Sequence, residues 1–211
     1  MHITGYAFIV GGGIAIERAC ALALAKDGAA GLLIADIDTS AAQETAAQYQ
    51  ETTVSMTIGL FSQMDYCVEC ADIGPNSHAE IAGFDLFAYQ CMLDVNITGT
   101  FLVIHQVSGF MRGQEPRQLL SLLVLESAVS HVAMPGVAPY TAAKHAVVGV
   151  VKTAAIDNIP HGICINAVCP SFVNTPEEVI TKMHLMGCIA NAEEVVDAVC
   201  FSCSDRSSYM T

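Results

Sequence analysis

Basic residues are scarce in this chain of 211 residues, and tryptophan is absent. The chain has 8 Lys and Arg against 21 Asp and Glu, which gives a formal net charge of −13 at pH 7. Such a charge repels the phosphate backbone of nucleic acids and anionic membrane surfaces, so we expect neither as a partner. The length suits one hydrophobic core, and we predict a single domain over residues 1–211.

A secretory leader and a membrane-spanning run are also lacking. The N-terminus has no basic segment and no small-residue cleavage site. Hydrophobic residues make up 53% of the chain, but charged residues such as Asp36, Glu126, Lys144 and Lys152 interrupt the apolar runs before they reach the length of a spanning helix. We therefore expect a large buried core.

The nine cysteines are odd in number and lie in apolar segments, which indicates reduced thiols and a cytoplasmic location. Two C-x-x-C pairs occur, Cys67/Cys70 and Cys200/Cys203. A zinc site would need both pairs on tight loops, whereas the first lies in a strand-like run and the second ends an apolar helix. The sequence therefore predicts no metal site.

Short apolar runs alternate with segments of helical period along the whole chain, a pattern that predicts the α/β class. The expected strands are residues 6–10, 32–35, 65–70, 119–125 and 163–168. The expected helices are residues 16–26, 39–49, 87–111, 138–157 and 192–202. We predict a doubly wound, Rossmann-like parallel sheet with helices on both faces.

Tyr140 and Lys144 lie four positions apart, so both side chains project from one face of the predicted helix. Ser127 precedes the tyrosine by 13 positions and follows an apolar strand. Asn96 lies in the segment D-V-N-I-T-G, and Asn166 begins the segment N-A-V-C-P. In order and spacing, these motifs resemble the short-chain dehydrogenase/reductase family from about residue 6 to residue 210.

Each catalytic candidate has a chemical reason for its place. A tyrosine with a pKa of about 10 is a poor proton donor near neutrality unless a cation lowers that pKa, and Lys144 is placed to do so. Ser127 can hydrogen-bond the substrate oxygen and stabilise the charge that develops there. The resemblance implies that Lys144 also binds the nicotinamide ribose and that Asn96 holds a water for proton relay. Asn96 could instead satisfy a break in its helix.

The resemblance also implies a dinucleotide site, whose family motif is T-G-x-x-x-G-I-G. The first glycine is present as Gly11, but Ala15 and Glu17 replace the other two, and Glu17 puts an anion where a diphosphate is expected. Asp36 is placed to accept ribose hydroxyls, which favours NAD(H) over NADP(H), although it could also be a strand-end carboxylate or a helix cap. The expected cofactor-binding residues are Gly11, Gly13, Ala15, Ile16, Asp36, Ile37, Ala71, Lys144, Pro170, Val173 and Thr175.

Further departures from the family pattern also lie in the part expected to bind the nucleotide. The family's N-N-A-G turn reads Glu69-Cys-Ala-Asp72, and its P-G turn reads Pro170-Ser171. The connection between Thr57 and Gln63 is too short for the helix usual there, and the sequence stops before a last strand. We therefore expect a fold that lacks one helix and the last strand.

These observations leave different functions open. The first is an NAD(H)-dependent oxidoreductase that interconverts a secondary alcohol and a ketone, with Tyr140 as acid and base. The second is a protein of the same fold without redox activity or cofactor, which catalyses an isomerisation, cyclisation or elimination with the same site. A catalytically silent binding subunit is the third.

The apolar segment 176–192 corresponds to the family's substrate lid and indicates a hydrophobic substrate such as a polyketide, terpenoid or steroid-like ketone. It could equally be an amphipathic helix packed on the core. The resemblance also implies a homodimer or homotetramer, formed through the two long helices that carry Asn96 and Tyr140.

Overall fold

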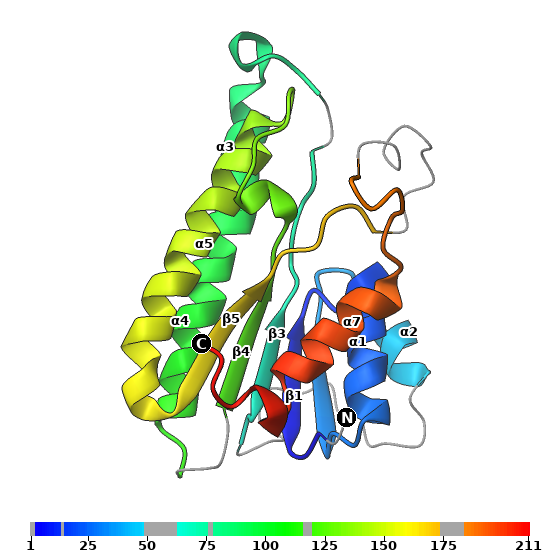
Figure 1. The fold of residues 1–211 in the computed structure, drawn as a ribbon, viewed down its shortest axis with the longest axis vertical. Helices are drawn as coiled ribbons and strands as arrows, with labels where there is room; N and C mark the ends of the chain where they lie inside the picture. The colour runs from blue at the N-terminus through cyan, green and yellow to red at the C-terminus, as the bar shows by residue number, and fades with distance from the viewer. Residues whose placement is uncertain (1–2, 14, 49–62, 76–77, 116–119, 174–183) are drawn as a thin grey trace.

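A computed structural model describes residues 3–13, 15–48, 63–75, 78–115, 120–173 and 184–211. In these residues one parallel sheet has the strand order β2-β1-β3-β4-β5 (Figure 1). The strands are β1 Tyr6–Val10, β2 Gly31–Ala35, β3 Tyr66–Glu69, β4 Leu120–Leu125 and β5 Ile163–Val168. The helices are α1 Ala15–Lys26, α2 Thr39–Ala47, α3 Leu86–Leu93, α4 Thr100–Arg112, α5 Ala138–Asn158 and α7 Ala192–Ser202. The predicted doubly wound sheet is confirmed.

Helices cover both faces of this sheet, which is why its strands read as continuous apolar runs. All six residues of β4 are buried. Helices α1 and α7 pack on one face, and α4 and α5 pack on the other (Figure 1). The side chains that make these contacts are Cys20, Leu24, Val195 and Val199 on the first face and Ile104, Val107, Val147 and Val151 on the second.

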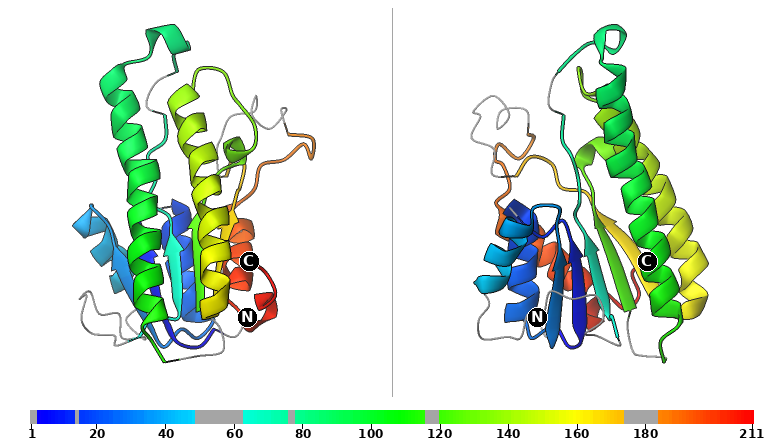
Figure 2. Two further views of the ribbon diagram at one scale, coloured as in Figure 1. Left: turned by 90° about the vertical axis from the view of Figure 1, so that its left-hand side faces the viewer. Right: turned by 180° about the vertical axis from the view of Figure 1, so that it is seen from behind.

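Residues 86–112 form one continuous helical stretch in which a π-helical segment, Asp94–Gly99, joins α3 to α4. By length and composition this stretch could cross a membrane, so the expectation that every apolar run is too short was wrong here. In the fold, Ile104, Val107 and Met111 of α4 are buried in the core. One face of α4 therefore packs on the core, whereas most of the stretch is exposed and its α3 end extends beyond the sheet (Figures 1 and 2).

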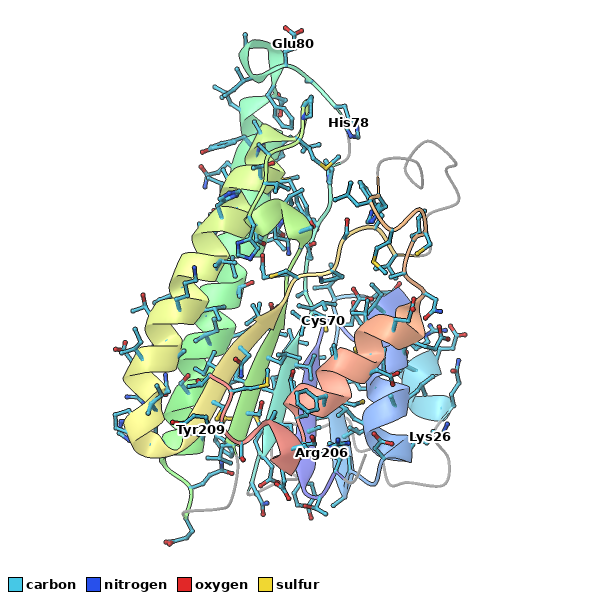
Figure 3. The ribbon with its side chains drawn as sticks, in the orientation of Figure 1. Lys26, Cys70, His78, Glu80, Arg206 and Tyr209 are labelled. Atoms are coloured by element: carbon cyan, nitrogen blue, oxygen red, sulfur yellow. The ribbon has the colours of Figure 1, made fainter. Side chains whose placement is uncertain are left out.

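The carboxyl ends of the parallel strands lie at the same edge of the sheet. Val10 pairs with Ala35 on one side and with Glu69 on the other, and Glu69 pairs with Val124. The loops that follow β1, β2, β3 and β4 consequently open at one end of the molecule. Cys70, just after β3, lies at this carboxyl edge of the sheet, whereas Arg206 and Tyr209 lie toward the opposite edge (Figure 3).

The sequence predicted that a helix before β3 and a last strand at the end of the chain are missing. The connection that precedes Gln63, where the helix was expected to be missing, lies outside the described residues. At the other end, the chain forms a 3-10 turn at Asp205–Ser207. The hydroxyl of Thr211 then accepts a hydrogen bond from the backbone N–H of Ile165 at 3.1 Å. The terminal residues therefore contact β5, where the described sheet ends.

Candidate active site

Tyr140 and Lys144 lie in the first two turns of α5, where Pro139 is in the first turn and a four-residue spacing stacks the two side chains. The Lys144 ammonium is 5.5 Å from the centre of the Tyr140 ring. Ser127, two residues after the end of β4, is close enough to the Tyr140 side chain to influence its pKa. The structure thus brings together the three residues that the sequence predicted for acid/base chemistry.

Two carboxylates surround the lysine. Lys144 Nζ lies 3.2 Å from Asp72 Oδ2 and 3.4 Å from Glu126 Oε1. The lysine and Glu126 side chains are 3% and 2% exposed, whereas Asp72 is 25% exposed. Ser130 also donates a hydrogen bond to Glu126, at 2.8 Å. One buried cation therefore serves two anions, and the net charge of the three side chains is negative when both carboxylates are ionised.

Tyr140 itself donates a hydrogen bond to Asp72 Oδ2 at 2.9 Å. Burial, followed by the negative charge of Asp72 and this hydrogen bond, raises the pKa of Tyr140 well above its usual value, and the interaction with Ser127 opposes the increase only in part. The expectation that Tyr140 has a lowered pKa was therefore wrong, because burial and Asp72 outweigh the nearby cation. The charge of Lys144 is balanced by its carboxylate partners, so little of it acts on the phenol.

Asn96 lies in the π-helical segment and is buried. Its side-chain amide donates to the backbone oxygen of Ile73 at 2.9 Å and accepts from the backbone N–H of Ile73 at 3.0 Å. These two bonds tie the loop after β3 to the helix, as expected of a residue that satisfies polar groups at a helix irregularity. The relay water implied by the resemblance stays a prediction.

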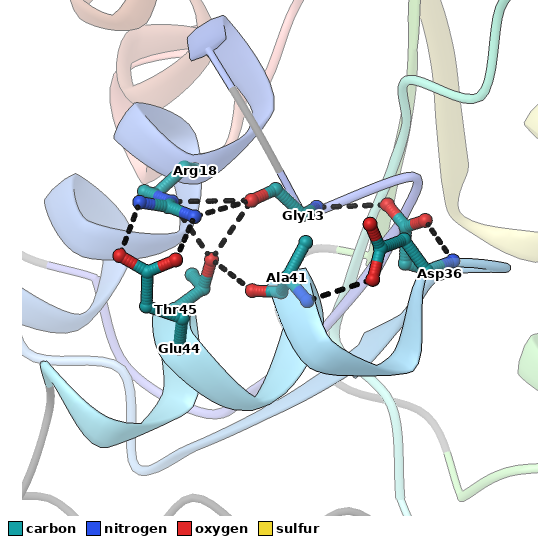
Figure 4. A network of polar contacts seen from close by, with 7 residues as sticks. Gly13, Arg18, Asp36, Ala41, Glu44 and Thr45 are labelled. Carbon is teal, nitrogen blue, oxygen red and sulfur yellow. Dashed lines mark hydrogen bonds and ion pairs between the residues drawn. The ribbon is translucent and has the colours of Figure 1, made fainter.

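The turn after β1 retains its dinucleotide-type backbone. Gly11 has φ +80°, and a Cβ on this residue would lie 2.8 Å from the backbone of Ala71. Gly13 donates its N–H to Asp36 Oδ2 at 2.9 Å, and its oxygen accepts from Arg18, which also pairs with Glu44 (Figure 4). These contacts hold the loops after β1 and β2 against each other.

Asp36 does not cap the next helix. That role belongs to Asp38, whose side chain accepts a hydrogen bond from Ala41 N at 3.0 Å. Asp36 accepts one hydrogen bond at each oxygen, from Gly13 N and from Asp38 N. Because a carboxylate has about four acceptor positions, it retains capacity for further donors such as ribose hydroxyls.

Glu17 lies in the first turn of α1. Burial raises its pKa to about 7, a hydrogen bond from its own backbone opposes the increase, and the charges of Asp72 and Asp36 add to it. Its Oε2 atom is buried with no hydrogen-bond partner in the described part of the chain. The predicted anion is therefore present at this helix terminus, but it is neutral over part of the ordinary pH range.

The remaining predicted cofactor residues have varied surroundings. Ile16 packs against the core, whereas Ile37 is fully exposed after β2. Pro170 accepts a hydrogen bond from Ala128 N at 2.8 Å, and Val173 forms a β-bridge with Ala190. The backbone of Ala15 begins α1, and Thr175 lies outside the described residues.

The predicted substrate lid is described only from residue 184. His184 shares a hydrogen bond with Ser171 at 3.1 Å and packs edge-on against Phe172. The next two side chains, Leu185 and Met186, are 106% and 85% exposed. The described part therefore presents apolar side chains to solvent rather than packing as a helix on the core.

Three acidic residues of this region were not predicted as site residues. Asp72 and Glu69 were seen only as departures from the N-N-A-G turn, and Glu126 only as a charge that interrupts an apolar run. Their positions in the sequence could have revealed them, because Glu69 ends β3 and Glu126 follows β4. Ligand sites of parallel sheets lie at these carboxyl ends of the strands. Glu69 is 2% exposed, and it accepts hydrogen bonds from Ala71 N at 3.0 Å and from the Thr100 hydroxyl at 3.3 Å.

Glu69 should make the protein less stable at alkaline pH. Burial raises its pKa from 4.5 to about 7, so the folded state binds this proton more tightly than the unfolded state. The stabilisation is complete below about pH 4.5 and is lost as the pH rises through about 7, with a loss of up to about 3 kcal/mol. Urea unfolding at pH 5, 6, 7 and 8 measures this, and we expect Glu69→Gln to flatten the profile. A profile as steep as that of the wild type would contradict the assignment.

Comparisons with known proteins agree with this geometry. A family model described as "Enoyl-(Acyl carrier protein) reductase" matches residues 45–211. Short-chain dehydrogenase fogB of Aspergillus ruber is 41% identical over 257 aligned positions, which cover 100% of this chain and 94% of that protein. Short-chain dehydrogenase virB of Hypocrea virens is 43% identical over 234 positions with the same coverage. The crystal structure of acetoin dehydrogenase YohF from Salmonella typhimurium has a TM-score of 0.86 at 25% identity, and covers 99% of this chain and 93% of that one.

The chain belongs to the short-chain dehydrogenase/reductase family and is an enzyme of the oxidoreductase class. The alignment with fogB runs over 257 positions although this chain has 211 residues, all of them covered. The relative therefore carries segments, inside the aligned region, that this chain lacks. This agrees with the expectation of a shortened fold.

The family implies a nicotinamide dinucleotide, and the described residues fit one. Gly11 permits a close approach of backbone to ligand, and Asp36 has spare acceptor capacity at the end of β2. Glu17 restricts the pH range in which a dinucleotide fits. Its anionic form repels a diphosphate at the start of α1, and its neutral form does not. Gly11, Gly13 and Asp36 would hold the adenosine and diphosphate portions, and Lys144 would face the nicotinamide ribose.

Proposed function

We propose that this protein is an NAD(H)-dependent oxidoreductase that interconverts a secondary alcohol and a ketone, with Tyr140 as acid and base. The observation that carries the proposal is the cluster of Ser127, Tyr140 and Lys144 at the same sheet edge as Asp36. NAD(H) is favoured over NADP(H) because the Asp36 carboxylate would repel a 2′-phosphate.

When bound, the dinucleotide supplies the hydride acceptor or donor. Tyr140 Oη exchanges the proton of the substrate oxygen, since it is the hydroxyl of the cluster that is hydrogen-bonded to the Asp72 carboxylate and lies near Ser127. Ser127 stabilises the charge that develops on the substrate oxygen. Lys144 is held by its two carboxylate partners and keeps its position beneath the tyrosine ring.

We propose a hydrophobic small molecule as the substrate, supported by the apolar, exposed Leu185 and Met186 of the lid segment. We also propose a homo-oligomer, a dimer or tetramer formed through α4 and α5, which lie side by side (Figure 2). These helices expose Phe101, Leu102 and Ile156 at 51%, 51% and 70%, and association of two copies would cover this area. All nine cysteines are free thiols, which supports a cytoplasmic location.

Binding of NADH should weaken as the pH rises from about 6 to about 8. Glu17, with a pKa of about 7, becomes anionic in this range and opposes the diphosphate. An added charge of this kind changes affinity by roughly tenfold, about 1.4 kcal/mol. Calorimetric titration at both pH values checks this, and we expect Glu17→Gln to bind at pH 8 as tightly as the wild type does at pH 6. Glu80→Gln, an exposed change at the far tip of the molecule, is the control (Figure 3).

The same titrations decide the cofactor. NADPH should bind more weakly than NADH in every variant because Asp36 is unchanged. If neither wild type nor Glu17→Gln binds NADH, NAD(H) dependence is refuted, and cofactor-free chemistry at Tyr140 becomes the explanation to test.

A further inference from the structure

Asp72 stands where the family's N-N-A-G turn has glycine, and its carboxylate reaches the centre of the site. A single oxygen, Asp72 Oδ2, accepts the hydroxyl proton of Tyr140 at 2.9 Å and lies 3.2 Å from Lys144 Nζ. Because glycine has no side chain, a family member with glycine at this position cannot make this contact. Asp72 is therefore a fourth residue beside the three that the sequence pattern predicts.

An ionised carboxylate can only accept hydrogen bonds, so the proton between the two oxygens belongs to Tyr140 at rest. Formation of a phenolate would put a second negative charge 2.9 Å from Asp72. The titratable groups that face this pair are Lys144 from α5, Glu126 after β4 and Glu17 from α1. Only the lysine is cationic, and it is shared with Glu126, so the surroundings favour a neutral phenol.

We propose that Asp72 is the proton acceptor behind Tyr140, a positioning residue that lets the tyrosine act as a base without becoming a phenolate. The inference rests on the proposed function, in which Tyr140 exchanges the substrate proton. As an alcohol is oxidised, its hydride goes to NAD⁺ and its hydroxyl proton goes to Tyr140 Oη. The proton of Tyr140 moves at the same time to Asp72 Oδ2, so tyrosine stays neutral and the carboxylate becomes a carboxylic acid.

The rest of the geometry suits this transfer. When Asp72 is protonated, Lys144 keeps an ionic partner in Glu126, 3.4 Å away, so no buried cation is left unpaired. Asp72 is 25% exposed and can pass its proton to water directly, which the 2% exposed Glu126 cannot do. A separate proton relay through Asn96 is then unnecessary, in agreement with the use of that amide by the backbone of Ile73.

The test is Asp72→Asn, which keeps the size of the side chain and removes its ability to take a proton. With NAD⁺ and a set of cyclic and aryl secondary alcohols, we expect kcat for oxidation at pH 7 to fall by about 10²-fold, the lower end of general-base contributions, with little change in KM. Oxidation should then require the phenolate and rise about tenfold per pH unit. Asp72→Glu, which restores a carboxylate, should recover part of the rate at pH 7.

A second measurement does not depend on turnover. In protein labelled with fluorotyrosine, fluorine NMR follows ionisation of each phenol, and Tyr140→Phe identifies the resonance of residue 140. We expect the Tyr140 midpoint to move to lower pH in Asp72→Asn by at least about one pKa unit, because the neighbouring charge and its hydrogen bond are removed. Asp157→Asn is the control, an exposed change about 25 Å along the same helix.

An unchanged midpoint in Asp72→Asn, or a pH profile and rate equal to those of Asp157→Asn, would overturn the proposal. Absence of turnover in the wild type despite bound NADH would instead refute the proposed function. In that case a lowered Tyr140 midpoint would show only that Asp72 keeps the phenol of Tyr140 protonated.

Discussion

Replacing Tyr140 with phenylalanine is expected to reduce turnover by about 10²–10⁴-fold, the range that a positioned acid/base group contributes. The hydroxyl is the group that donates a hydrogen bond to Asp72 and lies near Ser127. Folding should be retained, because the ring stays in place and Asp72 keeps its ion pair with Lys144. Initial rates of NAD⁺-dependent alcohol oxidation and thermal unfolding are the measurements.

Tyr209→Phe is the matched control, because this phenol is fully exposed and lies far from the site (Figure 3). Its rates should equal those of the wild type. Undiminished oxidation in Tyr140→Phe would remove the tyrosine from every mechanism argued above, including the transfer to Asp72.

Replacing Lys144 with methionine is expected to cost both activity and stability. The change leaves Glu126, 2% exposed, without its cation, and breaking a buried ion pair on one side typically costs about 3–5 kcal/mol. Burial already raises the pKa of Glu126, while Lys144 opposes that increase, so the variant should bind a proton there at higher pH than the wild type does. Urea unfolding near pH 7 measures the loss, with Lys152→Met, on the exposed face of α5, as control.

A double variant separates stability from chemistry. Lys144→Met combined with Glu126→Gln removes the uncompensated charge, so we expect it to recover much of the lost free energy of unfolding. Activity should stay low, because no cation then lies beneath the Tyr140 ring. Full recovery of the rate in the double variant would show that Lys144 serves only to balance Glu126.

Local patterns were sufficient to predict most of the fold. The strand at Ile163–Val168 and the helix at Ala192–Ser202 agree with the expected ranges, since a buried parallel strand and an amphipathic helix each carry their own periodicity. A break in the helix at Asn96 was considered, but the π-helical form of Asp94–Gly99 was not foreseen, because its apolar pattern is that of an ordinary helix. The pairing order of the strands was expected only from the class of fold.

The sequence by itself determined which groups we propose for the chemistry. Tyr140 and Lys144 are four residues apart on one helix, so local geometry alone places them on one face. Only the tertiary structure decided their electrostatic environment. Asp72 is 68 residues from Tyr140, and the parallel pairing of β3 with β4 places the loop of Asp72 beside the segment that leads to α5. Because a pKa depends on burial and on charges within a few ångströms, whatever their distance along the chain, the sequence predicted a tyrosine with a lowered pKa, whereas the fold raises it.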